Sequence, residues 1–223
     1  MLASDTRRTF YNARGELTRY DDGTRKTYGS DSIIVTGTGS VPLLEAVCRR
    51  ITSAPLDSLD QVLEIIGEER NRFATADLPA FHLEHGLWRT GWFMSGRFHR
   101  NDASGFKMAL IAYHPGLGHE LRVHGPGAAV PLIPIDDDRA GPWDVVKSLL
   151  SGCRMCDVDE DPGESLAFNA RLMRAIIAGC ADVFPSVSPV SEISVHLIDG
   201  TTRQLPAECG ERSIADGQLT VAE

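Results

Sequence analysis

The chain passes from a strand to a helix within residues 32–51, SIIVTGTGSVPLLEAVCRRI. Residues 32–36 are a short β-branched run, which predicts a strand, and the Gly37-Thr38-Gly39 sequence predicts a tight turn after it. Ser40 suits a helix N-cap and Pro42 suits the first helical turn. Apolar side chains then recur at helical spacing, so this segment predicts a strand, a turn and a helix over 40–53.

The segments that follow predict two groups of strands separated by helices. A capping box of Ser58 and Gln61 opens a second helix, over 58–74. The later elements are predicted as strands over 92–98, 106–113 and 120–124, helices over 142–152 and 164–184, and strands over 192–198 and 202–205.

Paired helices between antiparallel strands predict an α+β fold of four layers, α/β/β/α. In it two mainly antiparallel sheets are stacked and each is covered by a helical pair. A doubly wound parallel sheet would alternate single strands and single helices, and this order fits it poorly. We expect one domain over residues 1–206 and a polar tail over 207–223.

Composition excludes several classes of protein. A net charge of −9 over 223 residues argues against the clustered basic surface that nucleic-acid binding needs. No apolar run reaches the length of a membrane span, and the charged start lacks the features of a signal peptide. We therefore expect a cytoplasmic protein that contacts neither nucleic acid nor membrane, with its five cysteines reduced.

Three segments carry a family resemblance. These are Leu2-Ala3-Ser4-Asp5-Thr6-Arg7, Arg25-Lys26-Thr27-Tyr28 with the strand and Gly-Thr-Gly turn after it, and residues 193–200, ISVHLIDG. They resemble the second strand, the lysine segment with the following strand, and the penultimate hairpin of proteasome β-subunits and of the bacterial two-component proteasome-like protease. Both belong to the N-terminal-nucleophile (Ntn) hydrolase superfamily. The similarity spans about residues 2–206, and its specific motifs lie in the first forty.

The resemblance implies a threonine-type peptidase or amidase that needs no cofactor. In that family the nucleophile is an N-terminal Thr whose α-amine accepts the hydroxyl proton. By position, Lys26 is the lysine beside that amine, Asp5 orients Lys26, and the Gly37 N–H is the oxyanion donor. The resemblance also implies a homo-oligomer that acts on peptide or amide substrates, with an ATPase or other regulatory subunit as a further candidate partner.

The sequence departs from the family pattern in two places. It begins at Met1, so the first strand and its nucleophile are not matched, and Gly125-Pro126-Gly127 stands where the family has Gly-Ser-Gly. The nearest matches to a second accessory Asp and Ser are Asp182, Ser186 and Ser188. Either an upstream Thr, Ser or Cys supplies the nucleophile, or this is a non-catalytic Ntn-fold structural or interaction subunit.

Other residues have simpler explanations. Asp5 and Lys26 could equally be ordinary surface charges, and Gly37 could serve only the turn. Cys153 and Cys156 lack the second cysteine pair of a structural zinc site.

The remaining singled-out side chains are predicted to be structural. The acidic residues 157–161 lack the spacing of a calcium loop and predict a solvated loop. His82 and His85 share a helical spacing without a third ligand. Four further side chains are predicted to lie in the core: Cys48, Cys180, Trp88 and Trp92.

Overall fold

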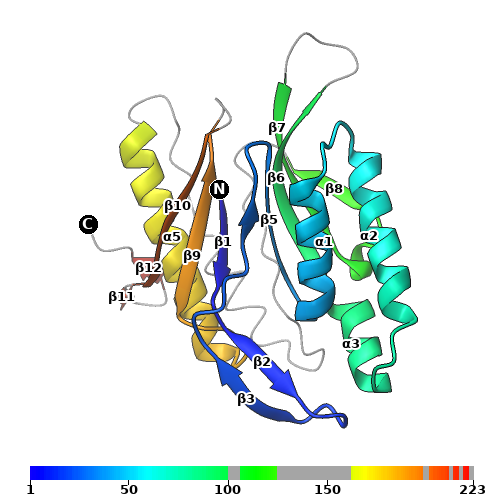
Figure 1. Ribbon diagram of the computed structural model, residues 1–223. Helices are drawn as coiled ribbons and strands as arrows, with labels where there is room; N and C mark the ends of the chain where they lie inside the picture. The colour runs from blue at the N-terminus through cyan, green and yellow to red at the C-terminus, as the bar shows by residue number, and fades with distance from the viewer. Residues whose placement is uncertain (100–105, 125–161, 198–200, 211–212, 216–217, 221–223) are drawn as a thin grey trace.

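The fold was analysed in a computed structural model that describes residues 1–99, 106–124, 162–197, 201–210, 213–215 and 218–220 (Figure 1). Its larger sheet is antiparallel, with the strand order β4-β5-β6-β7-β8. The bounds are β4 Tyr28–Gly29, β5 Ile33–Thr38, β6 Gly91–His99, β7 Phe106–Tyr113 and β8 Leu121–His124. The predicted meander is therefore present.

A second, three-stranded antiparallel sheet has the order β1-β9-β10. Its strands are β1 Leu2–Asp5, β9 Val190–His196 and β10 Thr202–Cys209. β10 thus runs past Leu205, where the sequence predicted its end. Two short antiparallel pairs lie apart from both sheets: β2 Arg8–Tyr11 with β3 Leu17–Asp21, and β11 Ser213–Ala215 with β12 Gln218–Thr220.

The helices cover the outer faces of the two sheets (Figure 1). On the large sheet α1 Val41–Ser53 packs on β5 and against α2 Leu59–Ala74, and α3 Ala80–Arg89 packs beside α2. On the small sheet α5 Pro162–Val183 packs on all three strands. The predicted helix over 142–152 lies outside the described residues.

Alternating side chains of β5 connect the layers. Ile34 faces the small sheet and packs with Leu2, Phe93 and Ala112 between the two sheets. Its neighbours Ile33 and Val35 face the other way, into the core formed with α1 and α2. Adjacent residues of a strand point to opposite faces, and here both faces are buried, which explains the unbroken apolar run in the sequence. The predicted α/β/β/α sandwich is confirmed.

The helix signals in the sequence match the local structure in α2. The Ser58 hydroxyl accepts from the Gln61 N–H and the Gln61 side chain bonds back to the Ser58 N–H, so the capping box is formed. Ser40 occupies the N-cap of α1, with Pro42 in the first turn, but its side chain makes no capping bond. Both helices bury their apolar stripes in the core with β5 and β6.

Several elements were not predicted from the sequence, among them α3 and β3. α3 follows Pro79, is only ten residues long and contains Gly86, a poor helix former, so it was not read as a helix. All five residues of β3 are exposed, so that strand shows no alternation. The prediction that Trp88 is a core residue is wrong, because it lies on α3 and is 59% exposed, whereas Trp92, Cys48 and Cys180 are buried as predicted.

Within the described residues, the structure has no helix that is both long enough and apolar enough to cross a membrane.

Two helical glycines should respond in opposite ways to substitution by alanine. A Cβ on Gly86 would lie 2.2 Å from the Phe73 ring in the core, whereas a Cβ on Gly67 of α2 would meet nothing within 4 Å. We expect Gly67→Ala to raise the free energy of unfolding by about 0.5–1 kcal/mol through helix propensity. Gly86→Ala should lower it by about 1–3 kcal/mol through overpacking.

Urea denaturation of the full chain measures both changes. A stabilising Gly86→Ala substitution would show that α3 does not pack against Phe73 as described.

Candidate functional site

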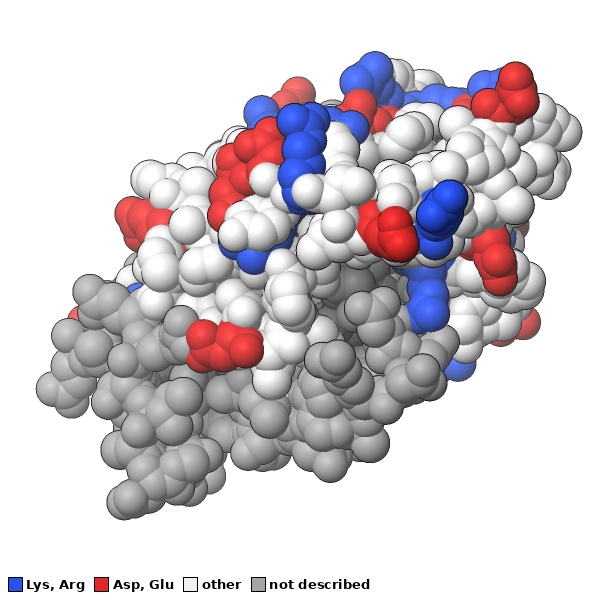
Figure 2. Space-filling model, turned by 90° about the horizontal axis from the view of Figure 1, so that it is seen from below, with Lys and Arg blue, Asp and Glu red and all other residues white. Residues whose placement is uncertain are grey.

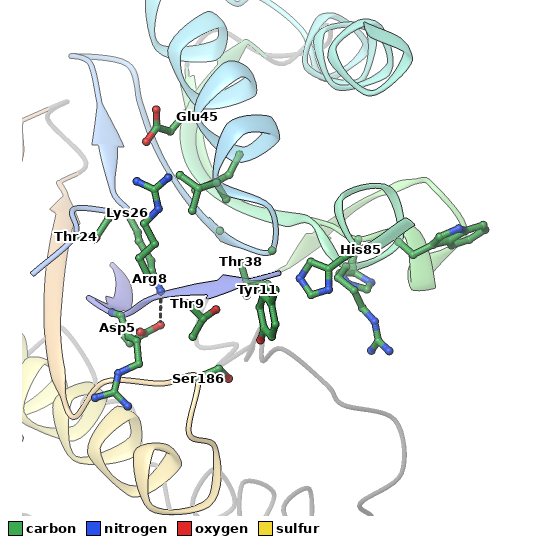
Figure 3. Close-up of a pocket in the computed structure, with 18 of the residues that line it drawn as sticks. Asp5, Arg8, Thr9, Tyr11, Thr24, Lys26, Thr38, Glu45, His85 and Ser186 are labelled. Carbon is green, nitrogen blue, oxygen red and sulfur yellow. Dashed lines mark hydrogen bonds and ion pairs between the residues drawn. The ribbon is translucent and has the colours of Figure 1, made fainter. Parts of the chain in front are cut away.

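A cavity of about 990 Å³ opens where the β2–β3 hairpin, α3 and the start of α1 meet the end of β1. All three residues predicted to be catalytic, Asp5, Lys26 and Gly37, line it. The face seen from below carries both basic and acidic side chains (Figure 2). Figure 3 shows the residues around the cavity.

Asp5 and Lys26 form an ion pair inside the cavity. The Lys26 Nζ lies 2.9 Å from the Asp5 Oδ2 (dashed in Figure 3), and the two side chains are only 15% and 18% exposed. The other carboxylate oxygen, Oδ1, accepts from the Arg7 N–H at 2.7 Å and from the Ser188 N–H at 3.2 Å. The carboxylate is therefore held by two backbone segments, and it fixes the direction of the Lys26 ammonium.

Glu192 positions the backbone of Lys26, a role that sequence reasoning missed. It is 5% exposed, and its Oε1 accepts from the backbone N–H groups of Lys26 at 2.7 Å and Thr27 at 2.6 Å. The Ser4 hydroxyl donates to the same oxygen at 3.3 Å. A buried carboxylate in β9 thus anchors the segment that carries Lys26. Only its place amid apolar residues of a predicted strand could have marked it.

The backbone of β5 directs the Gly37 N–H to the same side as Lys26. The Ile33 C=O accepts from Ser30 on the β4 side, and the Ser32 C=O accepts from Arg97 on the β6 side. Amide groups alternate along a strand, so the N–H of Gly37 also faces the β4 side. The printed pairing of β4 with β5 begins at Tyr28 opposite Val35, and just before it the Lys26 N–H bonds to Glu192 instead of to β5.

Glycine at position 37 also has a packing reason. A Cβ there would lie 2.3 Å from the Gly91 carbonyl oxygen and 2.6 Å from Leu44 Cδ1, so no larger residue fits without movement. The catalytic roles of Asp5, Lys26 and Gly37 remain predictions, although the structure gathers the three residues around one cavity.

The accessory candidates separate into different environments. Ser186 lines the cavity (Figure 3), and Ser188 contacts Asp5 through its backbone N–H. Asp182 is exposed and is not among the residues around the cavity. Residues 125–127 lie outside the described residues, as do Cys153, Cys156 and the acidic stretch 157–161.

The wall opposite Lys26 is aromatic. Tyr11 of β2 packs against Phe81 and His85 of α3, with ring centroids 5.8 and 5.5 Å apart, and Phe81 stacks on His85 at 5.5 Å. Gly15 in the hairpin turn has a positive φ of 82°, and a Cβ there would lie 2.5 Å from the Phe81 ring. The hairpin is thereby held against α3, and it closes one side of the cavity.

His114 completes this wall beside α3. Its Nδ1 accepts from the Gly116 N–H at 3.0 Å and caps the short 3₁₀ helix η1, Pro115–Leu117. Burial, reinforced by the charges of Arg89 and Arg70, lowers the pKa of His114 below 6.5. The imidazole is therefore held in its neutral form, in which Nδ1 can accept.

A metal site is not apparent in this part of the chain. Among the residues that the structure describes, no three His, Cys, Asp or Glu side chains lie close enough together to hold a metal ion.

The chain matches no protein-family model. A search of curated proteins by similarity also found no match. Solved structures do resemble it. A Gly-1 mutant of Anbu from Hyphomicrobium sp. strain MC1 superimposes with a TM-score of 0.52 and 14% identity, over 93% of this chain and 82% of that one. Anbu, an ancestral β-subunit, from Yersinia bercovieri gives a TM-score of 0.50 and 13% identity, over 85% and 74%.

These neighbours establish a proteasome-like Ntn fold for this chain and correct the assignment made from its motifs. The predicted resemblance to proteasome β-subunits and to the two-component protease is wrong as an assignment, because the structural neighbours are Anbu proteins. The motifs misled because they mark strand ends and turns of the shared fold. Such positions are determined by backbone geometry and do not separate one branch of a superfamily from another.

Glu192 should matter more to stability than its neighbour Gln204, which donates to the other carboxylate oxygen at 3.3 Å. Glu192→Leu leaves the buried N–H of Thr27 and the N–H of Lys26 without their acceptor. We expect it to lower the free energy of unfolding by at least about 2 kcal/mol. Gln204→Leu, on an exposed side chain, should cost less than about 0.5 kcal/mol. Equal losses in urea denaturation would contradict the anchoring role.

The neutral state of His114 makes stability depend on pH. The unfolded chain binds a proton at this residue near pH 6.5, above the pKa in the folded state, so protonation favours unfolding. The contribution is present above that pH and is lost as the pH falls below it. The unfolding temperature of the native chain should therefore drop more between about pH 7.5 and pH 5.5 than that of His114→Asn, which keeps a capping oxygen. Parallel curves would exclude the effect.

Proposed function

We propose that this chain is a proteasome-like Ntn-fold subunit whose cavity hydrolyses amide bonds once an N-terminal Thr, Ser or Cys is presented to Lys26 and Asp5. The observation that carries the proposal is the partly buried ion pair of Lys26 with Asp5. It lies in a cavity that Gly37 also lines. Unlike an exposed surface ion pair, which contributes little, this pair is partly buried and its carboxylate is also fixed by two backbone N–H groups.

In the proposed reaction the hydroxyl or thiol of the N-terminal residue attacks the carbonyl carbon of the amide. The α-amine of the same residue accepts the proton. The tetrahedral oxyanion accepts a hydrogen bond from the Gly37 N–H. The amine then returns the proton to the leaving nitrogen, the C–N bond breaks, and water hydrolyses the acyl-enzyme by the same steps.

Lys26 and Asp5 act on that amine without reacting. The positive charge of Lys26 lowers the pKa of a neighbouring ammonium, which leaves more of the amine unprotonated and able to act as the base at neutral pH. Asp5 fixes the position of the ammonium at 2.9 Å, and Glu192 fixes the backbone under it. The segment 26–27 is therefore preorganised before any substrate binds.

The nucleophile belongs to a residue that precedes Leu2. Met1 lies at the far end of β1 from Asp5, about 13 Å away for four residues of strand. A preceding segment that ran antiparallel to β1 would return its first residue to the Asp5 end. Among the described strands β1 pairs only with β9, so such a segment would pair with the other edge of β1.

The remaining expectations complete the proposal. We infer a single domain over 1–206 with a tail over 207–223, in a cytoplasmic homo-oligomer that acts on peptides or other amides. Proteasome-like neighbours support an oligomer.

A non-catalytic subunit is the second candidate. The observation that favours it is in the sequence, where Pro126 replaces the hydroxyl residue of the family's Gly-Ser-Gly motif. Such a subunit would keep the fold and the Lys26–Asp5 pair as a structural contact. It would never be labelled by a reagent that reacts with an N-terminal nucleophile.

Activity measurements on the protein with its native upstream codons distinguish the two candidates. If a Thr, Ser or Cys is exposed there, a β-lactone probe should label it and the protein should hydrolyse amides. Lys26→Ala should then lower kcat at least about 100-fold, with a smaller loss for Asp5→Asn. Glu68→Gln serves as the control, because it only weakens an exposed ion pair with Arg50 on the α1–α2 surface.

The chain that begins at Met1 should show neither labelling nor hydrolysis. Hydrolysis by that chain would show that the proposed nucleophile is wrong. A folded Lys26→Ala variant with unchanged kcat would remove Lys26 from the mechanism.

A further inference from the structure

The cavity is basic although the protein is acidic. The chain as a whole carries a net charge of −9, yet more basic than acidic side chains line the cavity. The basic ones are Arg7, Arg8, Arg25, Lys26 and Arg89, and the acidic ones are Asp5, Glu45 and Glu84. A concave site lined mainly by one sign of charge concentrates ligands of the opposite sign.

Several of these charges are already neutralised by a fixed partner. Asp5 holds Lys26, and the Arg7 guanidinium makes a two-pronged contact with the Asp22 carboxylate at 2.8 and 2.9 Å. Glu45 pairs with Arg49, which points outward on α1 and is 71% exposed. These pairs contribute little net charge to the cavity.

Arg8 and Arg25 are held by uncharged groups. The Arg8 guanidinium lies over the Phe10 ring at 5.0 Å, and the Arg25 Nε donates to the Thr27 carbonyl oxygen at 2.8 Å. Both contacts orient the guanidinium and leave its charge in place. A guanidinium that is stacked on an aromatic ring can still donate its N–H groups, which lie in its own plane, to a carboxylate.

Both arginines lie close to the proposed reaction centre. Arg25 is adjacent to Lys26 in the chain, and Arg8 follows Asp5 by three residues, a backbone distance of at most about 11 Å. Their side chains are long enough to reach a group bound beside the Lys26–Asp5 pair. The start of α1 lines the same cavity with no acidic residue in its first turn, which adds weakly to the positive potential.

We infer that the cavity selects acidic peptides, with Arg8 and Arg25 binding a carboxylate side chain next to the amide bond to be cleaved. This inference rests on the proposed function for the cleavage step, while recognition of the carboxylate depends only on the cavity. Arg8 and Arg25 are the specificity-determining residues, and Lys26 is excluded from that role because Asp5 already holds it.

Binding of two labelled tetrapeptides, identical except for a central Glu or Gln, tests the inference without requiring hydrolysis. Fluorescence anisotropy with the full chain at low salt should show the Glu peptide binding about tenfold more tightly. The preference should fall as salt is raised. Arg8→Ala and Arg25→Gln should each reduce it several-fold, and the double variant should abolish it.

Arg19→Ala is the matched control. Arg19 stacks on the Phe10 ring at 4.2 Å, as Arg8 does at 5.0 Å, but it is exposed on β3 and does not line the cavity. This variant should keep the full preference for Glu. Circular dichroism and thermal unfolding confirm that each variant is folded, and Arg8→Lys should retain part of the preference through its charge.

Equal binding of the two peptides, no measurable binding of either, or a preference that survives the double variant would each overturn the inference. The two proposals fail separately. A Glu preference in a protein that never hydrolyses amides would refute the amidase and leave the acidic-peptide site standing. Hydrolysis without a Glu preference would support the amidase and refute the acidic-peptide site.

Discussion

The carboxylate of Asp5 joins three parts of the chain that are distant in sequence. It accepts from the Lys26 ammonium on one oxygen, and from the Arg7 and Ser188 backbone N–H groups on the other. The start of the chain, the segment before β4 and the loop before β9 therefore meet at one point. Each of these contacts is charge-assisted and partly buried, so displacement of any segment would leave a carboxylate without its donors.

The two-sheet sandwich makes that meeting possible. β1 pairs with β9, which brings the first residues beside residues 188–196, and Leu2 packs between the sheets against Ile34 of β5. Glu192 then links the sheets through the backbone of Lys26 and Thr27. Burial of apolar side chains positions the strands. The buried carboxylate of Glu192 and the half-buried carboxylate of Asp5 then position Lys26. This division explains why polar residues occur in strands that are otherwise buried.

Around this point the structure provides walls of different chemistry. The β2–β3 hairpin is held to α3 by the packing of Tyr11 and Gly15 on Phe81, which gives one aromatic side. Arg8 and Arg25 give a basic side next to the ion pair. A peptide that entered the cavity would meet an apolar surface and a positive surface at once. A site of this form binds through a few oriented polar groups against an apolar lining.

The sequence by itself determined the order of the layers. β-branched runs, turn residues and a capping box are local signals, and β5, α1, α2 and the β6–β7–β8 meander follow from them. The pairing of Asp5 with Lys26 was also accessible, because family-like motifs placed both residues, although the family assignment drawn from those motifs was wrong. Only the tertiary structure revealed Glu192, the cover formed by α3 and the hairpin, and the basic wall. These features depend on contacts between residues far apart in the chain, such as Glu192 with Lys26, 166 positions away, and no local pattern encodes a contact of that range.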